Sequence, residues 1–276
     1  MCHRDSIDTK GIFNLKIFTH QHLDLDAASA VSLFLLSNQN YHINNVHFVS
    51  AEYNGPMGPD DIAIDIFAGT RGIKGHESSA FSEILNMIAP KYDPAFRPMA
   101  TFIDAHDSSG DWKAVYGLPK SFNVPTILDF FRGYQRAFPG QDATLLRTWF
   151  AYIRGLWLSH QDFQKAKKLV NKKNDKITWV KDQHTVLVVG KVPQQVFSLL
   201  FDKGARFVVY ERENTMGIMR APKETTHIGS KIEWMLPDWF HHPSGFLSCW
   251  GTVKCPKDVH CGQSSERIAE YVSSFK

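Results

Sequence analysis

The feature that most constrains this chain is a short polar elbow between a strand-like segment and a helix-like segment. Residues 15–19 have the patterning of a strand, and residues 27–36 form an apolar run long enough for a buried helix. Between them stand His20, Asp24 and Asp26, in the spacing H-x-x-x-D-x-D. One imidazole and two carboxylates suit Mn²⁺ or Mg²⁺ better than structural zinc, which prefers sulfur and imidazole. An aspartate that caps the helix is the alternative, but it leaves the histidine unexplained. The elbow therefore predicts a metal site.

Composition and charge limit the class of protein. The 276 residues suffice for two domains of ordinary size, and an apolar content of 43% with 13% aromatic residues indicates packed cores. A net charge of only +3 excludes a polybasic tail binder but permits a local basic groove. No apolar run reaches the roughly 20 residues of a membrane span, and no apolar signal core follows the N-terminus. We therefore expect a cytoplasmic protein without a membrane segment.

The first half of the chain alternates strand-like and helix-like segments. We expect strands at residues 12–18, 45–50, 60–67 and 100–103, and helices at residues 27–36 and 79–89. This alternation predicts an α/β fold with a mostly parallel sheet, in which ligands bind beyond the carboxyl ends of the strands. The residues that fall at those ends are His20, Asp24, Asp26, Asp65, Asp104 and Asp107. Their coincidence at one edge is stronger evidence than any single motif.

Some of these residues also have structural explanations. Asp65 could cap a helix or pair with a cation, although a buried aspartate at a strand end is more often functional. His76 could simply precede a helix that Ser78 or Ser79 caps. Because His76 also lies in the next loop toward the same edge, both interpretations stay open.

The second half begins with helices and continues as another α/β unit. We expect helices at residues 125–138 and 142–158, whose aromatic residues at helical spacing are typical of a core. The lysine-rich residues 165–181 read as the solvated face of a linker helix, or as a rim that attracts a polyanion. Strands at residues 185–189, 205–210 and 215–221 follow, with a helix at 193–201. The predicted domains are residues 1–160, a linker at 161–184, and a smaller α/β domain at 185–276, across a cleft from the first.

Two further segments carry candidate ligand groups. Cys249, Cys255 and Cys261 with His260 form C-x5-C-x4-H-C, which lacks the close cysteine pairs of most zinc sites, so free thiols are expected. Residues 240–246 place a histidine before Pro-Ser-Gly, in a loop whose backbone donors could hold a phosphate or carboxylate. A plain surface turn is the alternative for this loop.

Taken together, these motifs resemble the Asp-His-His (DHH) phosphoesterase superfamily, which includes exonucleases and cyclic-dinucleotide phosphodiesterases. The resemblance runs from about His20 to Gly251 and is closest to the melanocyte-proliferating-gene type of metal-dependent hydrolase. The segments that carry it are His20-x-x-x-Asp24-x-Asp26, Asp65, Ile103-Asp104-Ala105-His106-Asp107, and His242-Pro243-Ser244-Gly245-Phe246. The chain departs from the family where Gly75-His76-Glu77 stands in place of Asp-His-His, and where Phe240-His241 replaces the Gly-Gly of a Gly-Gly-His-Pro loop.

The resemblance implies hydrolysis assisted by two divalent ions, Mn²⁺ or Mg²⁺. It implies that His20 and Asp24 hold one ion, that Asp26, His76 and Asp104 or Asp107 hold the other, and that Asp65 bridges them. Asp65, His76 and Asp107 are then the catalytic residues. The second domain is expected to bind a non-reacting phosphate through Arg212, Arg220, His242, Ser244 and Gly245.

Three functions remain open at this point. The chain is expected to be a phosphodiesterase or exonuclease that acts on short nucleic acids or nucleotides. The alternatives are a small-molecule phosphatase or pyrophosphatase, and a non-catalytic member that binds nucleotides or a protein. The basic residues 165–181 favour nucleic acid, whereas the changes at Gly75 and Glu77 favour the non-catalytic member. The sequence leaves a monomer and a homodimer both open.

Overall fold

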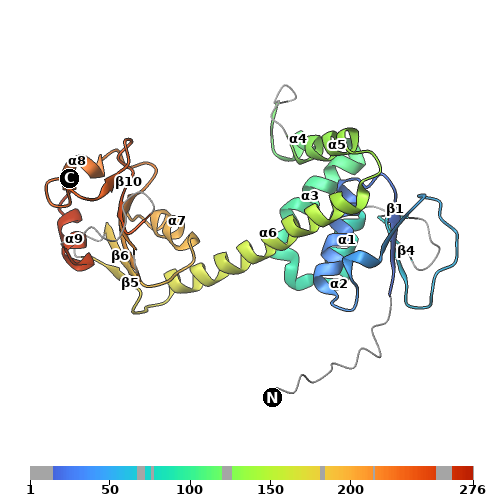
Figure 1. Cartoon of the computed structure of the whole chain (residues 1–276), viewed down its shortest axis with the longest axis horizontal. Helices are drawn as coiled ribbons and strands as arrows, with labels where there is room; N and C mark the ends of the chain where they lie inside the picture. The colour runs from blue at the N-terminus through green and yellow to red at the C-terminus, as the bar shows by residue number, and fades with distance from the viewer. Residues whose placement is uncertain are drawn as a thin grey trace, which may run out of the picture. The chain divides into compact units, whose positions relative to one another are not determined.

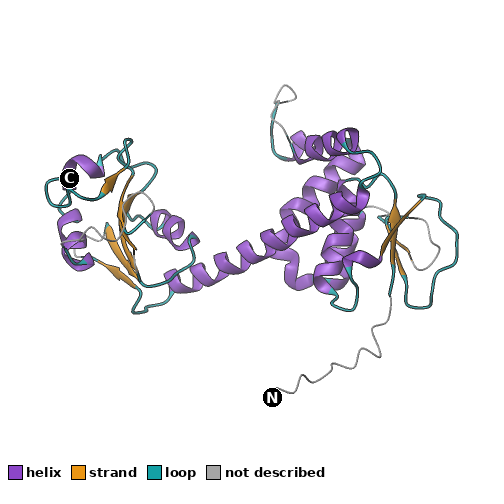
Figure 2. Ribbon diagram, in the orientation of Figure 1, coloured by secondary structure: helices purple, strands orange, loops and turns teal. Residues whose placement is uncertain are grey.

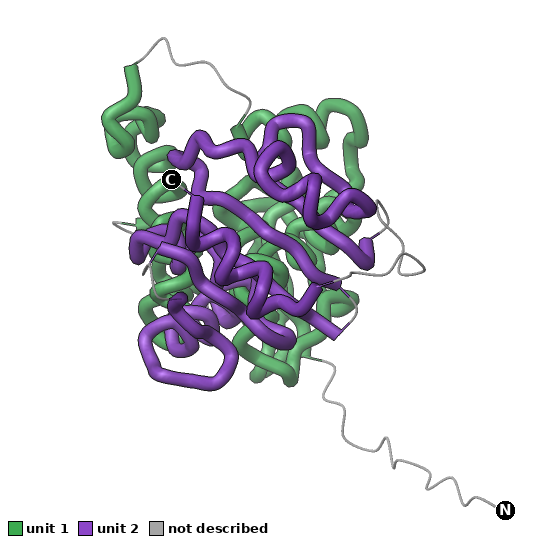
Figure 3. Tube along the Cα trace, turned by 90° about the vertical axis from the view of Figure 1, so that its left-hand side faces the viewer, with its two compact units in different colours: residues 1–158 green, residues 159–276 purple. Residues whose placement is uncertain are grey.

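The computed structural model describes residues 15–66, 72–75, 78–119, 126–180, 184–213, 215–252 and 263–275. The chain divides into two compact units, residues 1–158 and residues 159–276 (Figures 1 and 3). The fold is mixed α/β, as predicted, with a parallel sheet in the first unit and a mixed sheet in the second (Figure 2).

The first unit contains a four-stranded sheet in the order β2-β1-β3-β4. Its strands are β1 (Ile17–His20), β2 (Val46–Val49), β3 (Ile62–Ile64) and β4 (Gly72–Ile73). Every neighbouring pair is parallel, with Ile17 of β1 opposite Val46 and Ile62. The carboxyl ends of β1 and β3 therefore meet at one edge of the sheet, at His20 and just after Ile64.

Helices cover one face of this sheet, as Figure 1 shows. The helical elements of the first unit are α1 (Leu25–Ser37), η1 (Ile43–Asn45), α2 (Ala80–Ile88), η3 (Pro90–Tyr92), α3 (Asp93–Ser109), α4 (Trp112–Val115) and α5 (Ile127–Ala137), together with α6 (Asp142–Asn171), which continues into the second unit. Helix α1 is buried along most of its length, because α2 and the sheet pack against it. On the opposite face, Phe18, Ala63 and Ile66 pack against residues of the loop after β2, including Tyr53 and Met57.

The prediction of a strand at residues 100–103 is wrong, because these residues lie inside α3. Phe96, Ala100 and Ile103 are buried at the i, i+4, i+7 spacing of a helix face, and this spacing outweighs the short β-like run. The fourth strand of the sheet is instead β4. Asp104 and Asp107 consequently project from a helix rather than following a strand.

The second unit is built on a six-stranded sheet in the order β5-β6-β7-β8-β10-β9. The strands are β5 (Ile177–Trp179), β6 (Thr185–Val189), β7 (Phe207–Arg212), β8 (Thr215–Arg220), β9 (Phe240–His241) and β10 (Leu247–Trp250). The pair β6 and β7 is parallel and the other pairs are antiparallel. The strands predicted at residues 185–189, 205–210 and 215–221 correspond to β6, β7 and β8.

Two apolar cores lie on the two faces of this sheet. On β7, Phe207 and Val209 face the core formed with α8 (Ile228–Ile232) and α9 (Ser265–Val272). Val208 faces the core formed with α7 (Gln195–Asp202) and the end of α6. Ala166 of α6 is buried in this second core, so the helical part of the lysine-rich segment packs on the sheet while its lysines face solvent. No helix among the described residues is long and apolar enough to cross a membrane.

Candidate metal centre

The elbow after β1 places His20 and Asp24 beside each other. Asp24 is the N-cap of α1, and its Oδ1 accepts a hydrogen bond from the Ala27 backbone N–H at 2.9 Å. Its Oδ2 lies 3.7 Å from His20 Nε2. Helix capping and a position beside the histidine are therefore compatible, because they use different oxygens of one carboxylate.

Two residues from the helices that follow hold the elbow in place. Both oxygens of Asp142, at the start of α6, accept backbone hydrogen bonds, from His22 and from Leu23, each at 3.0 Å. His22 has a φ of 61°, a left-handed conformation that is uncommon outside glycine. Gln135 Nε2 of α5 donates to the Leu23 carbonyl at 2.9 Å. The sequence reasoning did not identify Asp142 and Gln135, since nothing in a single sequence pairs residues that lie so far apart along the chain.

Asp65 follows β3 directly and faces His20 across the edge of the sheet. Its φ of 57° is also left-handed, a strained conformation for a residue with a side chain. The Asp65 backbone N–H donates to the Ile73 carbonyl of β4 at 2.9 Å, which fixes this conformation. Asp65 Oδ2 lies 3.2 Å from His20 Nε2. Strained residues of this kind concentrate at functional sites.

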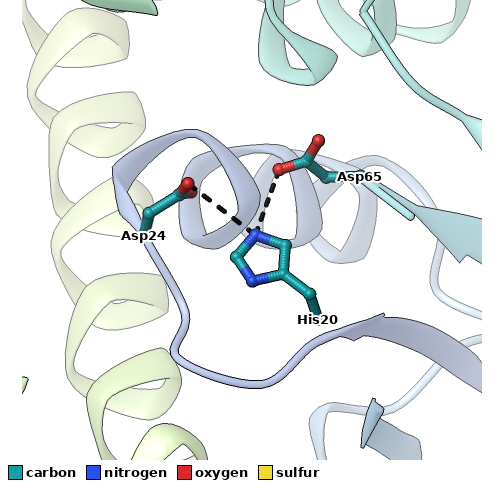
Figure 4. Close-up of side chains that lie close together, drawn as sticks. All are labelled: His20, Asp24 and Asp65. Carbon is teal, nitrogen blue, oxygen red and sulfur yellow. Dashed lines mark hydrogen bonds and ion pairs between the residues drawn. The ribbon is translucent and has the colours of Figure 1, made fainter. Parts of the chain in front are cut away.

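Figure 4 shows His20, Asp24 and Asp65 converging on one point. One ligand atom from each of the three residues lies within 4.8 Å of the other two. An imidazole with two carboxylate oxygens is a donor set that fits Mn²⁺, and Mg²⁺ as a harder alternative. These residues fit the divalent ion that the sequence predicted at the elbow.

Asp26 lies deeper and anchors a second helix. Its two oxygens accept the backbone N–H groups of Ala80 and Phe81, at 2.8 and 2.9 Å, at the start of α2. Burial, and then the neighbouring charge of Asp65, raise the pKa of Asp26 to about 8. Each oxygen keeps a second lone pair, so this structural role leaves Asp26 able to bind a cation as well.

The two aspartates of α3 have different surroundings. Both oxygens of Asp104 accept hydrogen bonds from the start of α2. Its Oδ1 accepts from Ser79 N and Ser79 Oγ, and its Oδ2 accepts from Ser82 Oγ. Asp107, three residues further along the helix, contacts His106 Nδ1 at 3.2 Å. Partial burial raises the pKa of Asp107, and the charges of Asp24 and Asp65 raise it further, although His106 lowers it. Of the two aspartates of α3, Asp107 therefore has the carboxylate that is less engaged in hydrogen bonds within the protein.

These side chains surround a cavity of about 250 Å³. Its lining consists of Asp26, Asp65, Lys74, Gly75, Ser78, Ser79, Asp104, Asp107 and Ser108. Among the described residues that line it, Lys74 is the only cation. Carboxylates that raise one another's pKa in a partly buried site are stabilised by a cation between them.

The raised pKa of His20 also indicates that this group of carboxylates favours a positive charge beside it. Burial lowers the pKa of this imidazole, but its hydrogen bonds to Asp65 and to the Gln21 carbonyl, with the charges of Asp24 and Asp65, raise it to about 9. The imidazolium thus supplies positive charge beside the carboxylates. A divalent ion bound through Nε2 would displace that proton.

The departure at Gly75 has a steric cause. A Cβ at this position would lie 1.7 Å from the backbone oxygen of Ser78, so the backbone accepts only glycine here. The aspartate of the family pattern therefore cannot be accommodated in this conformation. His76 and Glu77 lie outside the described residues.

In the second unit, the loop after β9 meets the end of β8. His242 Nδ1 lies 2.9 Å from Ser244 Oγ, and Arg220 donates from a terminal nitrogen to the Ser244 carbonyl at 3.2 Å. Gly245 has a φ of 70°, and a Cβ there would lie 2.5 Å from the His227 ring. His227 also contacts the loop, with its Nε2 3.1 Å from the Pro243 carbonyl oxygen. The sequence reasoning missed His227, whose position before a short helix resembles an ordinary cap.

Arg212 does not join this group. The register of β7 and β8 pairs Arg220 with Phe207 and Arg212 with Thr215, at opposite ends of the hairpin. Five residues of strand separate the ends, which is about 17 Å. The Arg212 guanidinium lies instead over the rings of Phe197 and Tyr210, at 5.3 and 5.7 Å from their centroids.

Of the cysteine segment, the structure describes Cys249, a buried residue of β10 whose Sγ lies 3.6 Å from Thr252 Oγ1. Cys255, His260 and Cys261 lie outside the described residues.

No family model matches the chain, and no curated protein sequence matches it. Among solved structures, it is similar to RecJ in complex with Mg²⁺ from Thermus thermophilus, with 10% identity, a TM-score of 0.31, and coverage of 94% of this chain and 49% of that one. The chain thus spans about half the length of that structure. A structure of exonuclease RecJ bound to manganese has 11% identity and a TM-score of 0.33, with 95% and 91% of the two chains covered. An uncharacterized protein from Helicobacter pylori has 8% identity and a TM-score of 0.26, with 94% and 98% covered.

Proposed function

We propose that this chain is a phosphoesterase of the DHH type that uses divalent metal ions to hydrolyse phosphodiester bonds in short nucleic acids or nucleotides. The observation that carries the proposal is the convergence of His20, Asp24 and Asp65 within 4.8 Å at the carboxyl ends of parallel strands. The RecJ structures are described with Mg²⁺ and with manganese, which agrees with the choice of ion.

In this proposal, the residues divide into one complete ion site and a second group of carboxylates. His20 Nε2, Asp24 Oδ2 and Asp65 Oδ2 would hold one ion. Asp26 and Asp107, which line one cavity with Asp65, are the carboxylates that would be available for a second ion. Bound ions of this kind supply Lewis-acid polarisation of a phosphoryl oxygen and lower the pKa of a water molecule.

Other residues around the cavity orient the substrate. Lys74 offers an ammonium group to a phosphate oxygen, beside carboxylates that would otherwise repel the phosphate. Asp104 positions the site and does not contact the substrate. It accepts hydrogen bonds from Ser79 and Ser82, which hold the start of α2 against the site. In the second unit, Arg220 and the loop of His242, Ser244 and Gly245 bind a phosphate that does not react.

The non-catalytic function remains the second candidate, and Gly75 is the observation that favours it. The close approach of the Ser78 oxygen excludes an aspartate at the first position of the Asp-His-His motif. A member without that carboxylate could bind metal and nucleotide through the remaining residues and still fail to turn over.

A hydrolysis panel with Mn²⁺ tests the proposal directly. The substrates are oligonucleotides, cyclic dinucleotides, nucleoside bisphosphates, pyrophosphate and bis(p-nitrophenyl) phosphate. We expect turnover of a phosphodiester that is lost in Asp65→Asn and retained in Asp60→Asn, an exposed aspartate before β3. Metal and nucleotide binding without any turnover by the wild-type protein would favour the non-catalytic member instead.

A further inference from the structure

The six-stranded sheet of the second unit ends on one side at β5, and this edge is open. The Val180 N–H donates to the Thr185 carbonyl of β6 at 2.9 Å. Because bonded and non-bonded pairs alternate between antiparallel strands, Thr178 is also bonded to β6, whereas the backbone groups of Ile177 and Trp179 point away from it. Among the described residues, neither of these two has a backbone partner on its outer side.

The edge also lacks the devices that protect most edge strands. Charged side chains and proline ordinarily prevent another strand from pairing there. The three residues of β5 are isoleucine, threonine and tryptophan, so neither device is present. The opposite edge, β9, is only two residues long and is followed closely by Pro243. Of the two edges, β5 is therefore the one suited to accept a further strand.

A groove of about 510 Å³ lies beside this edge, between β5 and α9. Helix α9 packs on β6 and β7, and the groove lies where the sheet extends past the helix to β5 (Figure 1). Val180, Leu187 and Ala269 give the groove an apolar floor. Thr178 is paired with Leu187, which faces the α9 core, so Thr178 also points to the α9 side of the sheet.

The wall of the groove on the α9 side is acidic. Glu266 and Glu270 lie one turn apart on α9, and both are exposed. No lysine or arginine is among the described residues that line the groove. Arg267 is displaced by about 100° around the helix from Glu266 and is not part of the lining. An apolar floor beside carboxylates fits arginine or lysine, whose stem is apolar and whose head is charged.

We propose that β5 binds an extended basic peptide as an added antiparallel strand, with arginine or lysine side chains lying in the groove beside α9. The outward backbone groups of Ile177 and Trp179 form the hydrogen bonds to the peptide. The peptide residue opposite Thr178 points, as Thr178 does, toward α9. Alternate peptide residues therefore have different roles, because one set bonds to β5 and the other set fills the groove.

A second copy of the chain is the main alternative occupant of the edge. Two β5 strands pair antiparallel about a two-fold axis perpendicular to the sheet, which puts both α9 helices on the same face. Glu266 and Glu270 of the two copies then face one shared groove with like charges. A basic peptide brings the opposite charge to the same place, so the charge of the groove favours the peptide.

The test measures fluorescence anisotropy of the full chain with a labelled heptapeptide in which arginine and valine alternate. Trp179→Pro should raise the Kd about tenfold or more, because proline removes an outward N–H and leaves the bonds to β6 in place. Trp179→Ala is the matched control, since it loses the same ring but keeps the N–H, and it should retain the wild-type Kd.

The charge of the groove is tested with a second pair of variants. Glu266→Gln with Glu270→Gln should weaken binding of the peptide and reduce its dependence on salt. Glu213→Gln with Glu233→Gln removes two exposed glutamates outside the groove, and should leave both unchanged. A peptide with glutamate in place of arginine should not bind the wild-type chain. Equal effects of the two double variants would contradict the role of the groove.

Two modified peptides keep the result decisive if a protein variant folds poorly, because they are measured with the wild-type chain. N-methylation of the valines removes the N–H groups that face β5 in an antiparallel strand, and should abolish binding. N-methylation of the arginines removes N–H groups that face away, and should leave the Kd unchanged. Equal binding of the three peptides, or loss with methylated arginines alone, would overturn the inference. So would a wild-type chain that ignores the peptide, or one that dimerises through β5 and becomes monomeric in Trp179→Pro.

Discussion

Asp142 holds His22 in its left-handed conformation, because the Asp142 Oδ2 accepts the His22 backbone N–H at 3.0 Å. The other oxygen accepts the Leu23 N–H at the same distance. The start of α6 thus fixes the elbow between the two proposed ligands His20 and Asp24, although it lies far from them in the sequence. In the proposed site, Asp142 would orient the ligands through the backbone of His22 and Leu23, without binding the ion.

Asp142→Ala should therefore weaken metal binding without removing a ligand. Losing the partner that orients a metal ligand lowers affinity about 10–100-fold. Isothermal titration with Mn²⁺ measures the change. Asp162→Ala is the matched control, since Asp162 lies on the same helix and pairs with the exposed Lys165. Equal affinities in the two variants would mean that the elbow keeps its shape without Asp142.

A second prediction concerns two glycines, at which substitution by alanine should change the free energy of unfolding in opposite directions. Gly75→Ala should destabilise the protein by about 1–3 kcal/mol, because the new Cβ would overlap the Ser78 backbone oxygen. Gly155→Ala, in the exposed middle of α6 with nothing near its Cβ, should stabilise it by about 0.5–1 kcal/mol. Urea unfolding monitored by circular dichroism measures both. A neutral Gly75→Ala would show that the loop before α2 adjusts easily.

The sequence predicted correctly the edge of the sheet where His20 and Asp65 lie. It did not predict correctly the helix that brings Asp104 and Asp107 to the same site. His20 and Asp65 lie at the ends of neighbouring parallel strands, and that arrangement follows from strand patterning alone. The strand expected at residues 100–103 is wrong because a run of three apolar residues and a threonine also fits a short strand, whereas the burial of Phe96, Ala100 and Ile103 requires a helix.

Long-range partners could not be predicted, for a different reason. Asp104 accepts hydrogen bonds from Ser79, the N-cap of α2, and Asp142 supports the elbow, but each contact joins residues that no local pattern connects. The resemblance implies Arg212 and Arg220 alike as phosphate-binding arginines of the second domain. The register places them at opposite ends of the hairpin, and register depends on the turn and on packing, which spacing along the chain does not reveal.

A third prediction concerns pH and an ion pair outside the site. Arg206 Nε donates to Glu224 Oε2 at 2.6 Å, and this hydrogen bond, more than any other factor, lowers the pKa of Glu224 to about 2. The unfolded chain protonates near the ordinary value of about 4.3, so the stabilisation is complete above that pH and is lost as the pH falls toward about 2.

Glu224→Gln should therefore have a lower Tm than the wild-type protein at pH 7. In acid, the difference in Tm between the two proteins should disappear. The loss at neutral pH corresponds to about 1.5–3 kcal/mol, the range for a hydrogen bond to a charged group. Thermal unfolding of both proteins between about pH 7 and pH 2.5 should give curves that converge below about pH 4. Curves that stay parallel across this range would show that the pair contributes nothing to pH dependence.

The last prediction separates the roles of the two units. If His20, Asp24 and Asp65 hold the ion, Asp65→Asn should abolish hydrolysis at any substrate concentration, since the ion loses a charged ligand and the reacting phosphate loses its activation. His242→Ala should keep the ions, because His242 is not itself a proposed ligand and contacts Ser244 within the second unit. It should instead raise KM and lower kcat, since binding of a remote phosphate positions the reacting one.

Steady-state kinetics and Mn²⁺ titration on the same preparations decide between these roles. His42→Ala is the matched control for the histidine, because His42 caps a short 3-10 helix of the first unit, away from the proposed ligands. It should leave KM, kcat and metal content unchanged. A His242→Ala protein that loses its metal, together with an Asp65→Asn protein that keeps it and remains active, would mean that the two units have the reverse roles.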